Sequence, residues 1–148
     1  MLQKNRNFLL SPVAGAVCTT NLIMARILLV EDAFDGAEAI ARYLTTAGHT
    51  VKAVGNGKEA LKEVLENTPD AVLLDLLMPD LDGPSFLEVV RAYLRLYTLP
   101  VVVLTGLPDS PLVARIRRLS VSAILVKGKA GPADICAALE AAMKSLPT

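Results

Sequence analysis

The sequence predicts an α/β domain built on a doubly wound, five-stranded parallel sheet with helices on both faces. Short runs rich in leucine and β-branched residues alternate with longer stretches of helical character, and the short runs are almost continuously apolar. Continuously apolar strands indicate that both faces of the sheet are covered. Helical crossovers between successive strands then make the sheet parallel.

The expected strands are short segments bounded by Gly, Pro, Asp or Asn: RILLV at 26–30, TVKAV at 50–54, AVLLD at 71–75, PVVVL at 100–104 and SAILV at 122–126. Helices are expected between and after them, at 34–47, 58–66, 84–95, 111–119 and 132–144. Gly48 suits a helix C-terminus, and Pro84, Pro111 and Pro132 suit first helical turns. No repeat or low-complexity linker interrupts the alternation, which predicts a single domain.

Composition narrows the class of protein. The 148 residues fit one domain, and a hydrophobic content of 53% favours a globular chain. Fifteen basic and fifteen acidic residues cancel, so bulk attraction to nucleic acid or to an anionic membrane is not expected. Cys18 and Cys136 lie far apart without a CxxC pair, which predicts neither a zinc site nor a disulfide framework and favours the reducing cytoplasm.

Residues 1–23 are expected to be an extension to a domain that spans 24–148. Their basic start and short apolar run imitate an export signal, but Ser11 and Pro12 break the run, which is too short to cross a bilayer. We expect this extension to be poorly ordered and without function.

Polar residues follow the strands at their carboxyl ends, where open parallel sheets bind their ligands. They are Glu31 and Asp32 after the first strand, Asp75 at the end of the third, Thr105 after the fourth and Lys127 after the fifth. Carboxylates that cluster repel one another unless a hard cation lies among them, and Mg²⁺ suits such a site. A carboxylate can attack phosphorus while a cation, an ammonium and a hydroxyl stabilise the phosphoryl oxygens. The residues therefore indicate phosphoryl transfer to a carboxylate.

From about Ala25 to Ser145 the chain resembles the receiver domains of two-component response regulators. The resemblance rests on the acidic pair Glu31 and Asp32, on DLLMPDLDG from Asp75, on VVVLTG with Thr105 and on AILVKG with Lys127. It implies a flavodoxin-like strand order of 2-1-3-4-5, with Asp75 as the phosphoacceptor. It also implies that Asp32, Asp75 and the backbone carbonyl of Leu77 hold Mg²⁺, with Glu31 acting largely through water, and that Thr105 and Lys127 contact the phosphoryl group.

A histidine kinase or a histidine phosphotransfer protein is the implied phosphodonor, and an unidentified downstream protein is the implied output. On this interpretation the chain is not an enzyme beyond assisting its own phosphorylation and dephosphorylation, and it contacts neither nucleic acid nor membrane directly. Two alternatives stay open. One is a receiver that has lost phosphate control and acts only as an interaction module; the other, weaker because position 77 is leucine, is a phosphatase.

The sequence departs from the family at four positions. Leu77 and Leu107 stand where receivers often carry polar residues that orient the hydrolytic water, so slow dephosphorylation is expected. Ile124 replaces the aromatic ring that usually moves on activation, and Gly128 replaces the proline after the lysine. A weakened conformational switch is expected from both.

Two other features have ordinary interpretations. His49 has no cysteine or carboxylate near it in the sequence and is expected to be a surface turn residue. Arg115, Arg117 and Arg118 are expected to form a solvated helix face, although receivers commonly use that face for output.

Overall fold

The computed structural model describes residues 24–78 and 81–144. The strands are β1 (Arg26–Val30), β2 (Thr50–Val54), β3 (Ala71–Asp75), β4 (Val101–Thr105) and β5 (Ala123–Val126). The helices are α1 (Phe34–Thr46), α2 (Gly57–Glu66), α3 (Gly83–Ala92), the 3₁₀ turn η1 (Leu94–Leu96), α4 (Pro111–Ile116) and α5 (Pro132–Lys144). Residues 1–23, the expected extension, lie outside the described residues. Cys18 is one of them, so the expectation of no zinc site and no disulfide framework concerns a residue outside this range.

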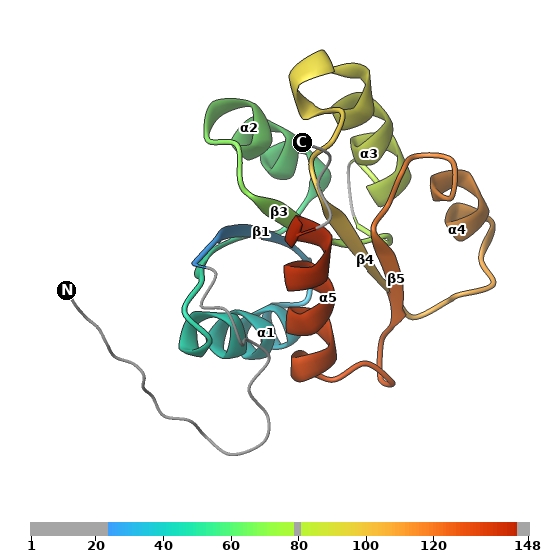
Figure 1. The fold of residues 1–148 in the computed structure, drawn as a ribbon. Helices are drawn as coiled ribbons and strands as arrows, with labels where there is room; N and C mark the ends of the chain where they lie inside the picture. Colours follow the sequence, from blue (N-terminus) through green and yellow to red (C-terminus); the bar gives the residue numbers. More distant parts are fainter. Residues whose placement is uncertain (1–23, 79–80, 145–148) are drawn as a thin grey trace.

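The sheet is parallel throughout, with the order β2-β1-β3-β4-β5, which confirms the predicted fold class. Helices α1 and α5 cover one face, while α2, α3 and α4 lie on the other (Figure 1). Each face has its own apolar cluster, because alternate residues of the central strands point to opposite sides. The result is a three-layer arrangement of helices, sheet and helices.

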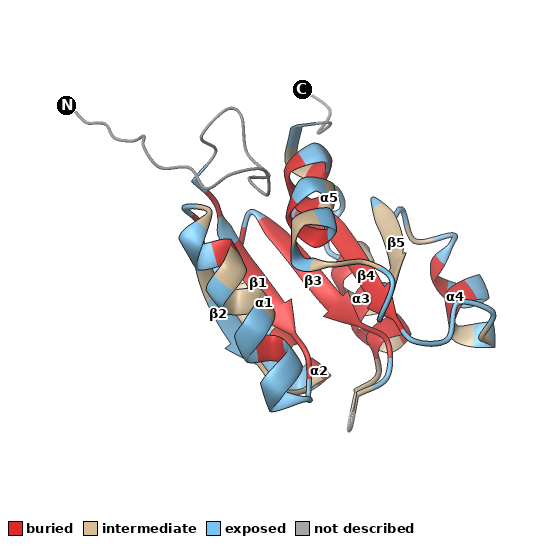
Figure 2. Cartoon of the chain, turned by 90° about the horizontal axis from the view of Figure 1, so that it is seen from below, coloured by how far each residue is buried: buried red, intermediate tan, exposed pale blue. Residues whose placement is uncertain are grey.

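Burial differs between the centre and one edge of the sheet. Every residue of β3 and β4 is buried, whereas every residue of β5 is only half-buried (Figure 2). Among the strands of the described residues, β5 pairs with β4 alone, and no strand lies along its other edge. The carboxyl ends of β3 and β4 therefore lie in a rigid setting, and the β5 edge is more open.

Two helices are shorter than the sequence predicts. Helix α3 ends at Ala92, and Tyr93 is extended, with φ −87° and ψ 125°. The Arg91 side chain holds the following turn by donating to the carbonyls of Leu96 and Leu119, at 3.1 and 2.8 Å. Helix α4 ends at Ile116. The Ile116 carbonyl accepts a hydrogen bond from the Leu119 N–H, three residues on, so the chain forms a tighter turn there. Ser120 follows with a φ of +58°, in the left-handed region.

His49 is buried rather than exposed, so the expectation of a surface turn residue is wrong. Only 3% of the residue is accessible. Its Nδ1 accepts a hydrogen bond from the Ala25 N–H at 3.1 Å, which leaves Nε2 to carry the proton and to donate to Glu140 at 2.9 Å. Glu140 lies on α5, 91 residues away, so this contact cannot be recognised from the residues around His49 in the sequence. This bond ties the start of β2 to α5.

No helix in ranges 24–78 and 81–144 combines the length and the apolar character that crossing a membrane requires.

We expect His49→Ala to lower the free energy of unfolding by about 3 kcal/mol, because it removes the hydrogen bond to the buried Glu140 carboxylate and that to the Ala25 N–H. Urea denaturation measures the change. Lys52→Ala, at an exposed position of β2, is the control and should stay within about 0.5 kcal/mol of the parent. An equally small effect at His49 would show that the buried pair contributes no net stability.

Candidate functional site

Asp75 is the last residue of the buried strand β3 and is itself only 5% accessible. Its Oδ1 accepts a hydrogen bond from the Leu77 N–H at 3.3 Å, so the turn after the strand helps to hold the carboxylate in place. A buried charge of this kind requires compensation by opposite charge or hydrogen bonds. The groups that supply it come from the neighbouring strand ends.

Gly83 allows the chain to return close to the end of β3. A Cβ atom at this position would lie 2.8 Å from the Leu76 Cα and 3.0 Å from the carbonyl oxygen of Asp75, so a larger residue would displace the strand end. Asp82 precedes it and caps α3 by accepting from the Ser85 N–H at 2.8 Å. The glycine and the cap together fix the backbone beside Asp75.

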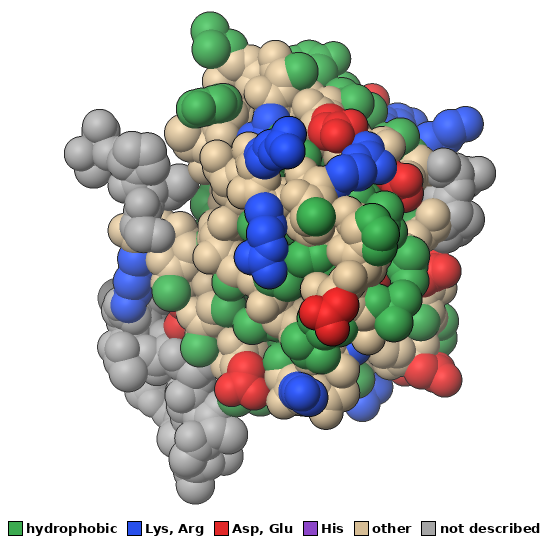
Figure 3. Space-filling model, turned by 90° about the vertical axis from the view of Figure 1, so that its right-hand side faces the viewer, with side chains coloured by type: hydrophobic (Ala, Val, Ile, Leu, Met, Phe, Trp, Pro, Cys, Tyr) green, Lys and Arg blue, Asp and Glu red, His purple; other side chains and the backbone are tan. Residues whose placement is uncertain are grey.

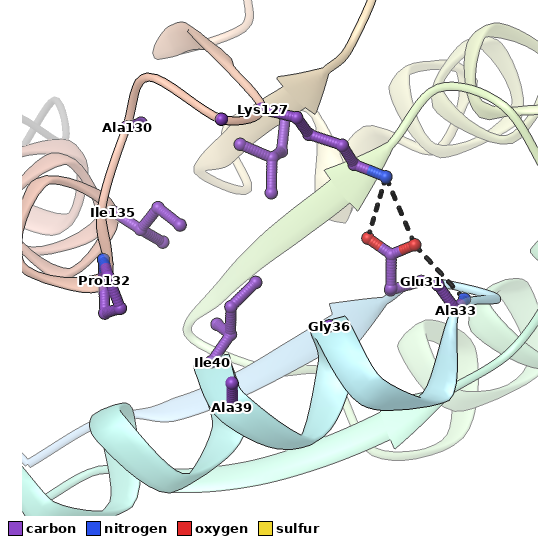
Figure 4. A pocket seen from close by; sticks show the side chains of 11 residues that line it. Glu31, Ala33, Gly36, Ala39, Ile40, Lys127, Ala130, Pro132 and Ile135 are labelled. Atoms are coloured by element: carbon purple, nitrogen blue, oxygen red, sulfur yellow. Dashed lines mark hydrogen bonds and ion pairs between the residues drawn. The ribbon is translucent and has the colours of Figure 1, made fainter.

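Lys127 joins two carboxylates. Its Nζ lies 3.1 Å from Oε1 of Glu31, 96 residues away in the sequence (Figure 4). The same Nζ lies 3.2 Å from Oδ2 of Asp75, 52 residues away. Glu31 also accepts from the Ala33 N–H at 3.2 Å. Three strand ends, those of β1, β3 and β5, are therefore connected by one ammonium group.

Burial and neighbouring charges shift the pKa values of Glu31 and Lys127. Burial and the nearby negative charge of Asp75 raise the pKa of Glu31 above its ordinary value, against the opposing effect of Lys127. Partial burial alone would lower the pKa of Lys127, but the attraction of Asp75 and Glu31 outweighs it and the pKa is raised. The ammonium thus stays charged, while the two acids remain under mutual repulsion.

Asp32 completes an acidic cluster. One carboxylate oxygen each of Glu31, Asp32 and Asp75 lies within 4.8 Å of the others; Asp32 is exposed and the other two are buried. Carboxylate oxygens with open access to water are the donor set that Mg²⁺ takes up, because it keeps several of its waters. The carboxylates of Glu31, Asp32 and Asp75 therefore form a donor set that fits that ion, and Lys127 already pairs with two of them, Glu31 and Asp75.

Thr105 ends β4 beside Asp75, since the β3 to β4 register pairs Asp75 with Leu104. The residue is 2% accessible, and its hydroxyl accepts from the Leu107 N–H at 3.0 Å. Its carbonyl oxygen accepts from the Lys127 N–H at 2.8 Å. The structure therefore places Thr105 next to the cluster and couples its backbone to that of Lys127.

A largely apolar cavity adjoins Glu31 and Lys127. This cavity, of about 270 Å³, opens between α1 and the loop before α5, with Glu31 and Lys127 at its edge and small or aliphatic side chains such as Gly36, Ile40 and Ile135 around it (Figure 4). Three large apolar side chains near the strand ends are exposed: Phe34, Leu77 and Leu107. None of these can hydrogen-bond a water through its side chain.

The comparisons with known proteins agree with this arrangement. The family profile described as "Response regulator receiver domain" matches residues 27–140. The chain belongs to the response regulator receiver family. The transcriptional regulatory protein PrrA of Mycobacterium tuberculosis is 40% identical over 73 residues, which are 49% of this chain and 31% of PrrA. The gliding motility regulatory protein of Myxococcus xanthus is 30% identical over 129 residues, which are 87% of this chain and 16% of that protein. The chain thus spans about a third or less of these relatives' length.

Solved receivers have the same fold. The chemotaxis response regulator CheY4 of Vibrio cholerae superimposes with a TM-score of 0.72 at 26% identity, covering 81% of this chain and 99% of that one. The receiver domain of the sensor histidine kinase PA1611 of Pseudomonas aeruginosa superimposes with a TM-score of 0.76 at 26% identity, covering 83% and 100%. That structure has a magnesium ion coordinated in its active site cleft.

We expect Mg²⁺ at about one hundred times its dissociation constant to raise the free energy of unfolding by about 2.7 kcal/mol, because a ligand of the folded state stabilises that state by mass action. Asp32→Ala removes an exposed carboxylate of the cluster and should weaken Mg²⁺ binding at least about tenfold. Thermal unfolding across a Mg²⁺ titration measures both. Asp109→Ala, in an exposed loop, is the control; an unchanged titration for Asp32→Ala would place the ion elsewhere.

Proposed function

We propose that this chain accepts a phosphoryl group on Asp75 from a histidine kinase or a histidine phosphotransfer protein, in the cytoplasm, and signals through contacts with another protein. The observation that carries the proposal is the position of Lys127, whose Nζ lies 3.2 Å from Asp75 inside the acidic cluster. A nucleophilic carboxylate, a positive group beside it and ligands for a cation are the parts that phosphoryl transfer requires.

In the proposed reaction an oxygen of Asp75 attacks phosphorus, and the bond from phosphorus to the donor's imidazole nitrogen breaks. The electron pair of that bond returns to the imidazole. Asp32, Asp75 and the Leu77 carbonyl would hold Mg²⁺, which would supply positive charge to the phosphoryl oxygens. Lys127 provides a second positive charge, and it gives up part of its interaction with Asp75 as the acyl phosphate forms. The Thr105 hydroxyl, at the adjoining strand end, donates to a phosphoryl oxygen.

A second candidate is a receiver that acts only as an interaction module. The departures at Ile124 and Gly128 favour it, because both weaken the usual coupling of phosphorylation to the outer face. All the charged groups of the site are nevertheless brought together, at the separations described above, and a module without phosphate control would have no need of them. We therefore favour the phosphorylated receiver.

Asp75→Asn should abolish labelling by acetyl phosphate in the presence of Mg²⁺, because the amide has the shape of the carboxylate but is not a nucleophile. Intact mass shows whether one phosphoryl group is added, and circular dichroism shows that the variant is folded. Asp109→Asn is the control and should label like the parent. Full labelling of Asp75→Asn would contradict the assignment.

The phosphorylated form should be long-lived. Hydrolysis requires a water aligned behind phosphorus, and the exposed side chains nearest the site in sequence, Leu77 at 51% and Leu107 at 56% accessibility, cannot orient one. Leu77→Asn introduces an amide that can, and we expect it to speed dephosphorylation about tenfold.

The decay of the phosphorylated protein, followed by intact mass after the phosphodonor is removed, measures this rate. Leu94→Asn is the matched control, since Leu94 is 93% accessible and lies at the opposite end of the strands. A parent protein that loses its phosphoryl group as fast as Leu77→Asn does would show that the leucines do not exclude the hydrolytic water.

A further inference from the structure

The loop between β3 and α3 carries Leu77, whose backbone carbonyl is a proposed Mg²⁺ ligand. Both ends of this loop are bonded to the end of β3. The Leu77 N–H donates to Oδ1 of Asp75 at 3.3 Å, and the Gly83 N–H donates to the Leu76 carbonyl at 3.2 Å. A displacement of the loop near Gly83 is therefore passed on to the backbone beside Asp75.

A further contact reaches the loop from the first residue of α2. Gly57 is buried, and a Cβ atom there would overlap the carbonyl oxygen of Leu81. The same atom would lie 2.8 Å from the Leu81 Cβ and 2.9 Å from the Leu81 carbonyl carbon. Backbone atoms and a Cβ cannot rotate aside as the end of a long side chain can. Any side chain at position 57 must therefore move either the loop or α2.

Helix α2 is the less movable of the two. Its N-terminus is capped by the Asn56 side chain, which accepts from the Glu59 N–H at 2.9 Å. Ala60 and Val64 are fully buried in the apolar cluster that the helix shares with the central strands and with α3, which lies next to it (Figure 1). Leu81 is only half-buried. We therefore expect a side chain at position 57 to displace Leu81 rather than the helix.

The local backbone does not explain why this residue is glycine. Among the described glycines only Gly48 and Gly128 have a positive φ, so Gly57 adopts a conformation open to any residue. Alanine is also the better helix former, and helix propensity alone would favour it here. The close approach of Leu81 is the feature that requires the absence of a Cβ atom.

We propose that Gly57 is a positioning residue for the phosphoryl-transfer site. By lacking a Cβ atom it lets Leu81 lie against α2, and this contact keeps the loop that carries Leu77 in the position that binds Mg²⁺. The inference rests on the proposed function, because it concerns the ion that would assist transfer to Asp75. Gly57 acts through Leu81 and Gly83, so its effect falls on Mg²⁺ affinity and on the rate of labelling.

The test compares Gly57→Ala with Gly55→Ala in the full chain. Gly55 lies two residues earlier and also has no positive φ, but a Cβ atom there would meet nothing within 4 Å, so it is the matched control. Isothermal titration calorimetry gives the Mg²⁺ dissociation constant, and amide NMR reports on Leu77 and Gly83. We expect Gly57→Ala to weaken Mg²⁺ binding at least about tenfold and to shift both amide signals, with Gly55→Ala within about twofold of the parent.

A second substitution separates positioning from stability. Leu81→Gly removes the Cβ that the new methyl group would meet, and it lets the backbone at this position turn without moving its neighbours. In the Leu81→Gly background, Gly57→Ala should therefore weaken Mg²⁺ binding by less than about threefold. Urea denaturation shows that each variant is folded under the conditions of the titration. A purely structural role would lower stability but leave the Mg²⁺ affinity of the folded protein unchanged.

Equal Mg²⁺ affinities for Gly57→Ala and Gly55→Ala would overturn the positioning role. So would a loss of affinity in Gly57→Ala that persists in full in the Leu81→Gly background. Acetyl phosphate labelling at saturating Mg²⁺ is measured in parallel, and Gly57→Ala should label more slowly than Gly55→Ala. A parent protein that is not labelled would contradict the proposed function, whereas the Mg²⁺ and amide measurements would still decide the role of Gly57.

Discussion

The ammonium of Lys127 is the group on which the arrangement of the site depends. It lies within 3.2 Å of carboxylates from two other strand ends, Glu31 and Asp75, both of which are buried. Without a positive charge between them these two buried acids would repel one another with little screening by water. The same repulsion makes the cluster receptive to a cation and to the charge changes of phosphoryl transfer. The stability of this site and its proposed function therefore depend on the same set of opposing charges.

The fold holds these charged groups in fixed positions. Asp75 ends a strand in which every residue is buried, and the adjoining β4 is buried as completely, so neither strand end can shift without disturbing both apolar clusters. Gly83 brings the return of the chain against the end of β3. The bond from the Lys127 N–H to the Thr105 carbonyl links the two remaining parts of the site. The rigid setting of Asp75, the proposed phosphoacceptor, contrasts with the half-buried β5 edge.

That contrast separates the acidic cluster from the open edge of the sheet. The acids lie at the carboxyl ends of the strands, and a groove lies along the outer edge, bounded by a short α4 and by β5, on the side of the molecule that Figure 3 shows. In a receiver with an aromatic ring at position 124, one side chain could connect the two regions. Isoleucine provides no such connection, so here the protein contacts of the edge and the chemistry of Asp75 are expected to be more independent than in related receivers.

The sequence by itself determined the class of fold, the strands and the polar residues at their ends, because strand periodicity, helix signals and the carboxyl-end rule are local or topological properties. It did not determine what depends on contacts between distant segments. The burial of His49 follows from Glu140, 91 residues away, and the end of α3 follows from bonds that Arg91 makes to the chain near Leu119. The groove depends on how far α4 extends over β5. Only tertiary packing decides such features, since each is set by which side chain the fold brings into reach.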